Sequence, residues 1–385
     1  MRAPLHLILP AILLLLGGCQ SVQPSWLGAP HRVAPGVEFY SSADPTLLDP
    51  PGDIAVYMLR LDPQQVRLDA VLSTGTVMGT ERVDEMAGRT GAVAAINGGF
   101  FNTRNGEPTG LLKIRGELVS DTRTPRGVVA IRAPPEGRTE LTFDQVAVRM
   151  SLRFAAADRE WTMPIDGVNT TRERGKLMLY TPAYLAHTDT APNGTEWVLA
   201  GQLLRVVDIQ SNVGRAPIMR DGVTLSYGGL ELPEPLAALI DGVEVRLETE
   251  WQSAHGVAAD DFDRAEHIIN GAGLLRRGGR VITDWESESL NPDTFLDVRH
   301  PRTLIGLDRQ GFIWLAAIDG RRAEYSQGMA FPDLQRLCDR LELTDALNLD
   351  GGGSTTMVLE GRVVNRPSDP AGPRAVSDAI LVMLK

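Results

Sequence analysis

The 385-residue sequence is poor in cysteine and has no excess of positive charge. Its two cysteines, Cys19 and Cys338, are too few for a disulfide framework or for a thiolate-rich zinc or iron–sulfur site. The formal net charge is −11, whereas proteins held on phosphate backbones by counterion release carry excess Lys and Arg. The composition therefore argues against a nucleic acid partner.

Several common catalytic motifs are also missing. The sequence contains no G-x-x-x-x-G-K-S/T phosphate loop, no H-E-x-x-H and no G-x-S-x-G. Ser354 follows glycines, but Thr355 and Thr356 come after it. The six histidines have no metal-ligand spacing. These absences exclude the common NTPases, zincins and α/β-hydrolases.

The N-terminus has one arginine followed by an apolar run from Leu7 to Leu16, which is too short to span a bilayer. Residues 1–18 are therefore predicted to be a signal peptide. Leu16-Gly17-Gly18-Cys19 resembles the lipobox of bacterial lipoproteins, so we expect Cys19 to be lipidated and residues 19–35 to form a tether. This predicts an exported bacterial lipoprotein of the cell envelope, bound to a membrane through its lipid. Gln20, rather than Asp, favours the outer membrane if the source is Gram-negative.

The rest of the sequence has the composition of a folded protein, with 43% hydrophobic residues, 39 glycines and 25 prolines. Residues 36–385 are predicted to form one strand-rich α+β (mixed α/β) domain with few helices and with Gly-rich loops at strand ends. Helices are expected at 81–88, 234–240 and 332–343. Strands are expected at 54–61, 66–72, 92–97, 127–132, 177–180, 243–249, 303–307, 312–318, 346–350 and 355–359. The secondary structure of residues 133–260 is the hardest to predict from the sequence, and these residues are expected to shape the cleft.

Three times, an apolar strand ends in Asn or Asp, is followed by glycines and then by a hairpin. The three loops are Asn97-Gly98-Gly99, Asn270-Gly271-Ala272-Gly273 and Asn348-Leu349-Asp350-Gly351-Gly352-Gly353-Ser354. Glycines permit positive φ and let the backbone approach a ligand closely, and the polar residue before them points off the strand end. Gathered at one end of a sheet, the three loops would form a pocket lined by N–H groups, amides and carboxylates.

Carboxylates and arginines are the reactive groups that remain near these loops. Asp319 ends one predicted strand, Asp350 lies in the third loop, and Asp378 follows a proline-containing turn. Arg302 and Arg374 lie close to the glycine loops in the sequence. Carboxylates suit acid–base work on a glycosidic bond, while guanidinium groups suit phosphate oxygens.

An ordered set of motifs from about Ala92 to the C-terminus resembles the phosphodiester glycosidase family, including bacterial members related to exopolysaccharide. The motifs are Asn97-Gly98-Gly99-Phe100-Phe101, Arg302-Thr303-Leu304-Ile305-Gly306, Asp319-Gly320-Arg321, Asn348 to Met357, Asn365-Arg366-Pro367-Ser368 and Arg374 to Ala379. The resemblance implies a hydrolase that releases the sugar from a sugar-1-phosphodiester in envelope or extracellular glycans and leaves a phosphomonoester. Gly271-Ala272-Gly273-Leu274 departs from the G-G-G-P-like run of relatives.

The resemblance and the loops together give the expected site. Asp350, Asp319 and Asn348 are predicted to be catalytic. The predicted substrate-binding residues are Asn97, Gly98, Gly99, Asn270, Arg302, Gly351, Gly352, Gly353, Ser354 and Arg374. No cofactor is expected, and although Asn and Asp oxygens could bind calcium, no calcium-loop spacing supports a metal.

Two other functions fit the same residues. One is a noncatalytic glycan-binding or exopolysaccharide-assembly lipoprotein, which would bind glycan and form no product. The other is a phosphodiesterase that cuts the P–O bond rather than the C–O bond.

Overall fold

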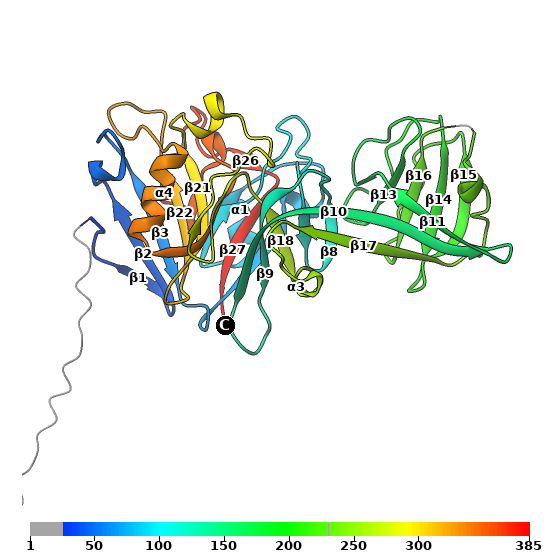
Figure 1. Cartoon of the computed structure of the whole chain (residues 1–385), viewed down its shortest axis with the longest axis horizontal. Helices are drawn as coiled ribbons and strands as arrows, with labels where there is room; N and C mark the ends of the chain where they lie inside the picture. Colours follow the sequence, from blue (N-terminus) through cyan, green and yellow to red (C-terminus); the bar gives the residue numbers. More distant parts are fainter. Residues whose placement is uncertain (1–25, 230) are drawn as a thin grey trace, which may run out of the picture.

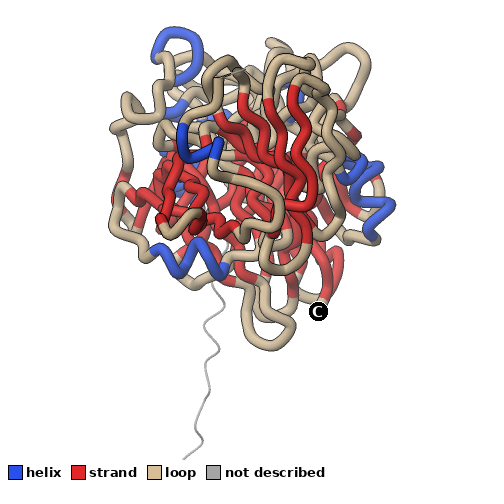
Figure 2. The backbone as a smooth tube through the Cα atoms, turned by 90° about the vertical axis from the view of Figure 1, so that its right-hand side faces the viewer, coloured by secondary structure: helices blue, strands red, loops and turns tan. Residues whose placement is uncertain are grey.

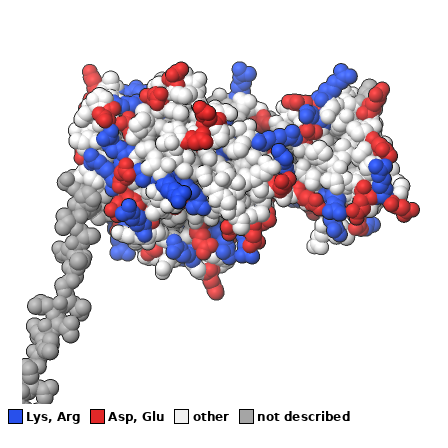
Figure 3. Space-filling model, in the orientation of Figure 1, with Lys and Arg blue, Asp and Glu red and all other residues white. Residues whose placement is uncertain are grey.

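The computed structural model describes residues 26–229 and 231–385. Figure 1 shows a larger body and a smaller lobe joined by two long strands. Seen from the lobe side, strands fill the interior of the molecule and helices lie at its periphery (Figure 2). Acidic and basic side chains are interspersed over the face shown in Figure 3.

The first sheet of the body has eight strands, and all its neighbours pair antiparallel. In spatial order they are β1 (His31–Ala34), β2 (Val37–Ser42), β3 (Val56–Leu61), β22 (Ile313–Ile318), β21 (Arg302–Asp308), β23 (Leu343–Asn348), β19 (Leu274–Arg277) and β20 (Arg280–Val281).

A second body sheet has five strands and contains the C-terminal strand next to its centre. Its order is β25 (Arg362–Val363), β24 (Met357–Leu359), β6 (Ala94–Asn97), β27 (Asp378–Leu384) and β4 (Val66–Leu72). A separate ribbon pairs β5 (Glu81–Arg82) with β26 (Ala375–Val376).

The third sheet extends from the body to the lobe. Its path is β11 (Arg159–Ile165), β10 (Glu140–Ala156), β9 (Arg126–Arg132), β18 (His267–Asn270), β7 (Leu112–Ile114) and β8 (Glu117–Ser120), and β17 (Val245–Ser253) also pairs with β10. β10 pairs with β9 through residues 140–146 and with β17 through residues 146–154, so one 17-residue strand belongs to both parts of the molecule.

We call residues 157–244 the small lobe. Beyond β11 it contains a five-stranded sheet in the order β12 (Gly167–Val168), β13 (Leu177–Tyr180), β16 (Gly222–Tyr227), β14 (Thr195–Ala200) and β15 (Arg205–Ser211). Its hydrophobic cluster includes Trp197 and Leu225 and extends to Leu152 of β10.

The main core lies where the three sheets of the body face one another, and Leu59, Ile96 and Ile269 each represent one sheet in it. α4 (Phe331–Arg340) covers the other face of the eight-stranded sheet with Leu334, Leu337 and Cys338. The other helices are α1 (Val83–Thr90), α2 (Glu234–Ala237) and α3 (Ala259–Arg264), with single turns at Pro45–Leu47, Ser73–Gly75, Pro292–Leu296 and Gly352–Ser354. Burial of one apolar stripe explains why these short helices are stable.

The strand-rich fold with few helices is confirmed, and each of the ten predicted strands overlaps an observed one. The three predicted helices are also present, although α2 ends at Ala237 instead of 240. Sequence patterns missed several strands, among them β1, β2, β10, β11, β14 to β16 and β27.

The predicted boundary of the tether at residue 35 is wrong. β1 lies inside the predicted tether and pairs with β2, and Trp26 and Leu27 pack against the core under α4. The folded part therefore begins before Gly36. The predicted signal peptide and Cys19 lie outside the described residues. Within the described ranges, no helix has the length and apolar character needed to cross a membrane.

Candidate functional site

The first and third glycine loops are joined directly. Asn97 ends β6, and its side-chain Nδ2 donates to the backbone carbonyl of Asp350 at 2.8 Å. The N–H of Asp350 donates in turn to the carbonyl of Gly98 at 3.2 Å. Asn97 Oδ1 accepts from the Thr303 hydroxyl at 2.9 Å and from the Thr356 N–H at 3.1 Å. The buried Asn97 side chain therefore holds the third loop in place.

The second loop joins the same cluster through Asn348, the last residue of β23. Its Nδ2 donates to the carbonyl of Ala272 at 2.8 Å, and its N–H donates to the carbonyl of Gly273 at 3.1 Å. Asn270 also packs against the first loop, because a Cβ on Gly99 would lie 2.8 Å from Asn270 Nδ2. The expected convergence of the three loops is thus present in the structure.

Two amide atoms in this cluster are buried without a hydrogen-bond partner among the described residues: Nδ2 of Asn270 and Oδ1 of Asn348. Both residues are about 1% exposed. Buried polar atoms are nearly always satisfied, so an orphaned donor and an orphaned acceptor on adjoining loops mark a place for a polar ligand or water.

Asp350 is the carboxylate that the loops present. Its Oδ1 accepts from the N–H of Gly351 at 2.8 Å, and its side chain is partly buried. Burial raises the pKa of Asp350 to about 6; the Ser354 hydroxyl, the Gly351 N–H and Arg374 oppose the rise, and Asp378 adds to it. A carboxyl group with such a pKa can exchange a proton near neutral pH.

Asp319 follows β22 and is 1% exposed. Its oxygens accept from Tyr325 Oη at 2.9 Å, from Asn365 Nδ2 at 2.8 Å and from the Arg366 N–H at 2.8 Å. Burial raises the pKa of Asp319, and these hydrogen bonds oppose that rise. Asn365 also donates to the carbonyl of Thr355 at 3.0 Å, so Asp319 reaches the third loop only through an intermediate residue.

Arg302 is fully buried at the start of β21 and makes no ion pair with a described carboxylate. Its guanidinium donates to the backbone carbonyls of Met329 and Val298 at 2.9 and 3.1 Å, and also to that of Phe295. Burial lowers the pKa of Arg302 to about 9, and Arg321 contributes to the decrease. Arg302 therefore supplies positive charge, while much of its hydrogen-bonding capacity already holds neighbouring loops.

The Gly351–Ser354 turn lies among arginines. The N–H of Gly351 donates to Asp350 and that of Gly352 donates to the Pro301 carbonyl at 2.9 Å, so these two N–H groups already have partners. The N–H of Ser354 donates to the Gly351 carbonyl at 3.1 Å and closes the turn.

Arg321 and Arg374 lie next to the glycines of this turn. A Cβ on Gly352 would lie 3.0 Å from a guanidinium nitrogen of Arg321, and one on Gly353 would lie 2.2 Å from a nitrogen of Arg374. Arg374 forms a bidentate pair with Asp369 at 2.8 and 3.1 Å. Arg321 is exposed, has φ +60°, and its side chain makes no hydrogen bond or ion pair with a described residue. A strained residue of this kind often marks a functional site.

Asp378 is part of the cluster, although the predicted site omitted it. It begins β27, is 1% exposed, and its Oδ1 accepts from the N–H of Gly99 at 2.9 Å. Its Oδ2 accepts from the Ser377 hydroxyl at 2.5 Å, and burial raises its pKa. The motif that ends in Ser377-Asp378 was visible in the sequence, but its contact with Gly99 depends on strand pairing between β27 and β6.

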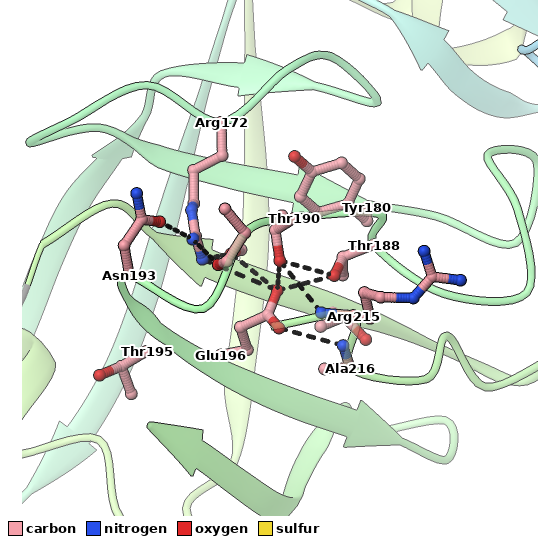
Figure 4. A network of polar contacts seen from close by, with 12 residues as sticks. Arg172, Tyr180, Thr188, Thr190, Asn193, Thr195, Glu196, Arg215 and Ala216 are labelled. Carbon is pink, nitrogen blue, oxygen red and sulfur yellow. Dashed lines mark hydrogen bonds and ion pairs between the residues drawn. The ribbon is translucent and has the colours of Figure 1, made fainter. Parts of the chain in front are cut away.

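Figure 4 shows a second polar network, in the small lobe, around Glu196 of β14. Its Oε1 accepts from the hydroxyls of Thr188, Thr190 and Ser226 at 2.8, 2.9 and 2.8 Å, and its Oε2 accepts from the Ala216 N–H at 3.0 Å. Arg172 lies 3.9 Å away. Because protein groups surround this buried carboxylate, it holds two loops of the lobe onto its sheet.

Across residues 26–229 and 231–385, no group of three or more His, Cys, Asp or Glu side chains could hold a metal ion.

The fold and the loop cluster define a β-sheet protein whose strand ends present one open carboxylate among arginines and amides. The sequence model of the family described as phosphodiester glycosidase matches residues 195–383. This segment matches the phosphodiester glycosidase family, and the resemblance seen in the sequence motifs is confirmed. The match includes Asn270, Asn348, Asp350 and Asp378, whereas the Asn97 loop lies outside it.

Curated relatives share a shorter stretch. The N-acetylglucosamine-1-phosphodiester alpha-N-acetylglucosaminidases of mouse and human are 30% and 31% identical over 130 and 121 residues, and each alignment covers 30% of this chain. The alignments cover 25% and 23% of those two proteins, so the chain matches about a quarter of their length. The prophage-derived protein YomE of Bacillus subtilis is 36% identical over 87 residues, which are 23% of this chain and 13% of YomE.

Two solved structures resemble the whole chain in fold. A Synechocystis protein has a TM-score of 0.77 at 21% identity and covers 95% of this chain and 64% of its own. A Burkholderia pseudomallei protein has a TM-score of 0.72 at 22% identity and covers 86% of this chain and 74% of its own. The architecture of body and lobe is therefore shared with these two proteins. Sequence identities this low support a common fold and carry no information on function.

Proposed function

We propose that this protein hydrolyses a sugar-1-phosphodiester, breaking the bond between the anomeric carbon and the phosphate oxygen. Water would supply the hydroxyl group of the released sugar, and the phosphate would leave as a phosphomonoester. The family match of residues 195–383 and the activity named for the mammalian relatives support this reaction class. The observation that carries the proposal is the placement of Asp350, with its raised pKa, in a turn flanked by Arg321 and Arg374.

Asp350 is the group that would act on the reacting carbon. The side-chain oxygens of Asp319 and Asp378 accept hydrogen bonds from buried protein donors, whereas Asp350 accepts from the N–H of Gly351. Because a phosphate is already a good leaving group, acid assistance matters less than stabilising the positive charge on the sugar or activating water. We therefore assign Asp350 an ionised role, and we assign Asp319 and Asp378 positioning roles.

The arginines would hold the departing phosphate. Arg321 is the most suitable of them, because its exposed guanidinium lies over Gly352 and has no protein partner among the described residues. Arg374 lies beside Gly353 and would add positive charge at the same turn, while the charge of the buried Arg302 acts on Arg321. The unpartnered amide atoms of Asn270 and Asn348 would bind sugar hydroxyls.

We also propose that the enzyme works on glycans of the bacterial cell envelope, anchored there through lipid on Cys19. The sequence from Met1 to Cys19 supports this location.

The test uses the protein without residues 1–19 and a synthetic N-acetylglucosamine-1-phosphodiester, with release of free sugar as the readout. Asp350→Asn should reduce release at least about 100-fold while binding of the substrate persists. Asp241→Asn, an exposed change in the small lobe, is the matched control and should leave release unaltered. A reaction in oxygen-18 water should place the label in the sugar.

Three results would contradict the proposal: no release from a panel of sugar-1-phosphodiesters, release that persists in Asp350→Asn, or label found in the phosphate. Saturable glycan binding with no product would favour the assembly role instead.

A further inference from the structure

A groove of about 650 Å³ adjoins the candidate site, and arginines outnumber carboxylates along it. Its charged lining residues are Arg82, Asp84, Arg322, Arg362, Arg366 and Asp369. The whole chain carries a net charge of −11, and acidic and basic side chains are interspersed over the face shown in Figure 3. The charge of the groove therefore differs in sign from the net charge of the whole chain.

The two carboxylates of the groove are already neutralised. Asp84 forms a bidentate pair with Arg82 at 2.9 and 2.8 Å, and Asp369 pairs with Arg374 of the candidate site. Three other lining arginines, at positions 322, 362 and 366, make no ion pair with a described carboxylate. The groove thus carries a surplus of positive charge.

The arginines of the groove keep donors available for a ligand. Arg362 and Arg366 are exposed, and no hydrogen bond or ion pair joins the Arg362 side chain to another described residue. The Arg366 guanidinium stacks over the Tyr325 ring, with its carbon 4.6 Å from the ring centroid. Arg322 donates one hydrogen bond, to the carbonyl of Pro367 at 3.2 Å.

The groove is continuous with the catalytic loop. Asn365 lines the groove and also donates to the Thr355 carbonyl, next to the Gly351–Ser354 turn. Asp369 lies on the other side, where a Cβ on Gly353 would be 2.2 Å from its Oδ1. Asn365 and Asp369 thus link the groove to the turn, so a substrate chain that extends past Gly353 enters the groove.

The wall of the groove is preformed. Asp319 accepts from the Arg366 N–H and the Asn365 side chain, and prolines stand at positions 367, 370 and 373. A rigid basic wall loses little conformational freedom on binding, which favours an extended anion.

We propose that the groove binds further phosphate groups of the same substrate molecule, so that the substrate class is an anionic glycan with several phosphodiester linkages. This inference rests on the proposed function, because it takes the sugar-1-phosphodiester at Asp350 as one linkage of a chain. The arginines of the groove would bind the phosphates that follow the scissile one.

Direct binding tests the groove without any reaction. The probe is a short linear inorganic polyphosphate, titrated into the protein at several salt concentrations. We expect binding that weakens with salt, and a slope of log K against log salt that becomes shallower by about 0.7 for each arginine lost in Arg362→Ala and in Arg362→Ala/Arg366→Ala. The matched control is Arg153→Ala/Arg159→Ala, which removes the same charge from exposed positions at the far end of β10 and in β11. That control should bind polyphosphate as the unmodified protein does.

A second measurement compares hydrolysis of a substrate with one phosphodiester and of an oligomer with several. We expect the oligomer to have a kcat/KM at least ten-fold higher, and Arg362→Ala/Arg366→Ala to remove most of that advantage. Polyphosphate binding that responds equally to the groove and control variants, or equal kcat/KM for both substrates, would overturn the groove assignment.

The two proposals fail in different ways. If neither substrate releases sugar but polyphosphate binding depends on Arg362, the groove stands and the hydrolase proposal falls. If the substrate with one phosphodiester is hydrolysed and polyphosphate binding is unchanged in Arg362→Ala, the hydrolase proposal stands and the groove assignment falls.

Discussion

Three aspartates lie near the glycine loops, and they differ in how far protein donors already engage them. Asp319 and Asp378 accept from buried hydroxyls, amides or N–H groups on both oxygens, while Asp350 accepts from the Gly351 N–H. Hydrogen bonds to a carboxylate hold it in place and favour its ionised form, but they also occupy the lone pairs that catalysis needs. Only the least engaged of the three is suited to contact a substrate.

The pH dependence of the reaction should report Asp350. Its pKa is raised to about 6 by burial, so the ionised form that we assign to catalysis is lost below that pH. The value of kcat/KM should therefore rise through about pH 6 and level off above it. Asp378 raises the pKa of Asp350 and Arg374 lowers it, so Asp378→Asn should move the rise to lower pH and Arg374→Ala to higher pH. A rise at the same pH in both variants would show that Asp350 is not the titrating group.

Gly98 connects two of these aspartates. Its carbonyl accepts from the Asp350 N–H, its own N–H donates to the Asp378 carbonyl, and a Cβ at this position would lie 1.9 Å from Asp378 Oδ1. Gly98→Ala must therefore displace Asp378 or the end of β6, and we expect a loss of sugar release of at least about ten-fold from a displacement near 1 Å.

The control is Gly88→Ala in α1, where an added Cβ meets nothing within 4 Å and should stabilise the helix by roughly 0.5–1 kcal/mol. Sugar release and circular dichroism of both variants give the comparison. Full activity in Gly98→Ala would mean that the packing of Gly98 against Asp378 does not matter for catalysis.

At the scale of elements, the small lobe depends on one buried carboxylate. Glu196 of β14 binds the loops that contain Thr188 and Ala216, as Figure 4 shows, and Arg172 lies beside it. Glu196→Ala would leave these groups buried without a partner, at a cost of about 3–5 kcal/mol in the free energy of unfolding.

Hydrogen exchange should locate this loss in β14 and the loop at 187–193, with the body less affected. Glu160→Ala breaks an exposed pair with Arg153 and should cost less than about 1 kcal/mol. Equal losses in the two variants would show that the network contributes no more than a surface ion pair.

Two of the strands that sequence patterns missed, β10 and β14, share a physical cause. β10 interrupts its apolar residues with Asp144 and Gln145, which are buried because they bind His255, Ser253 and Glu288. β14 likewise carries the buried Glu196. An alternation of apolar and polar residues predicts a strand only where polar side chains face solvent, so strands with buried polar networks look like loops in the sequence.

At the scale of the whole molecule, the glycine loops could be predicted because each depends on its own local sequence. Asn97, Asn270 and Asn348 end strands that the apolar patterns identified, and the structure places them together. The contact of Asp378 with Gly99 could not be predicted, since it requires β27 to pair between β6 and β4 across nearly 300 residues of sequence. The same holds for Arg321, whose position over Gly352 depends on β22 and β23 lying on either side of β21 in the eight-stranded sheet.

The concentration of buried carboxylates at one site has a consequence for global stability. Burial raises the pKa of Asp350 to about 6 from its ordinary value of 3.8, so the folded state binds a proton more tightly than the unfolded state does. The stabilising effect of that proton is fully present below about pH 3.8 and is lost as the pH rises through about 6. At neutral pH the folded protein therefore keeps a buried negative charge at a cost of about 2–3 kcal/mol.

Asp350→Asn removes this cost, because an amide is neutral at every pH and can still accept from the Gly351 N–H. The variant should be inactive yet more stable than the unmodified protein at pH 7, with a melting temperature a few degrees higher. The difference should shrink between pH 6 and pH 4 and vanish below that, which thermal unfolding across this range will measure. A variant that is less stable at pH 7, or a difference that does not change with pH, would mean that Asp350 is ionised in the folded protein at no cost. The proposed catalytic role would then lose the physical basis for its pH dependence.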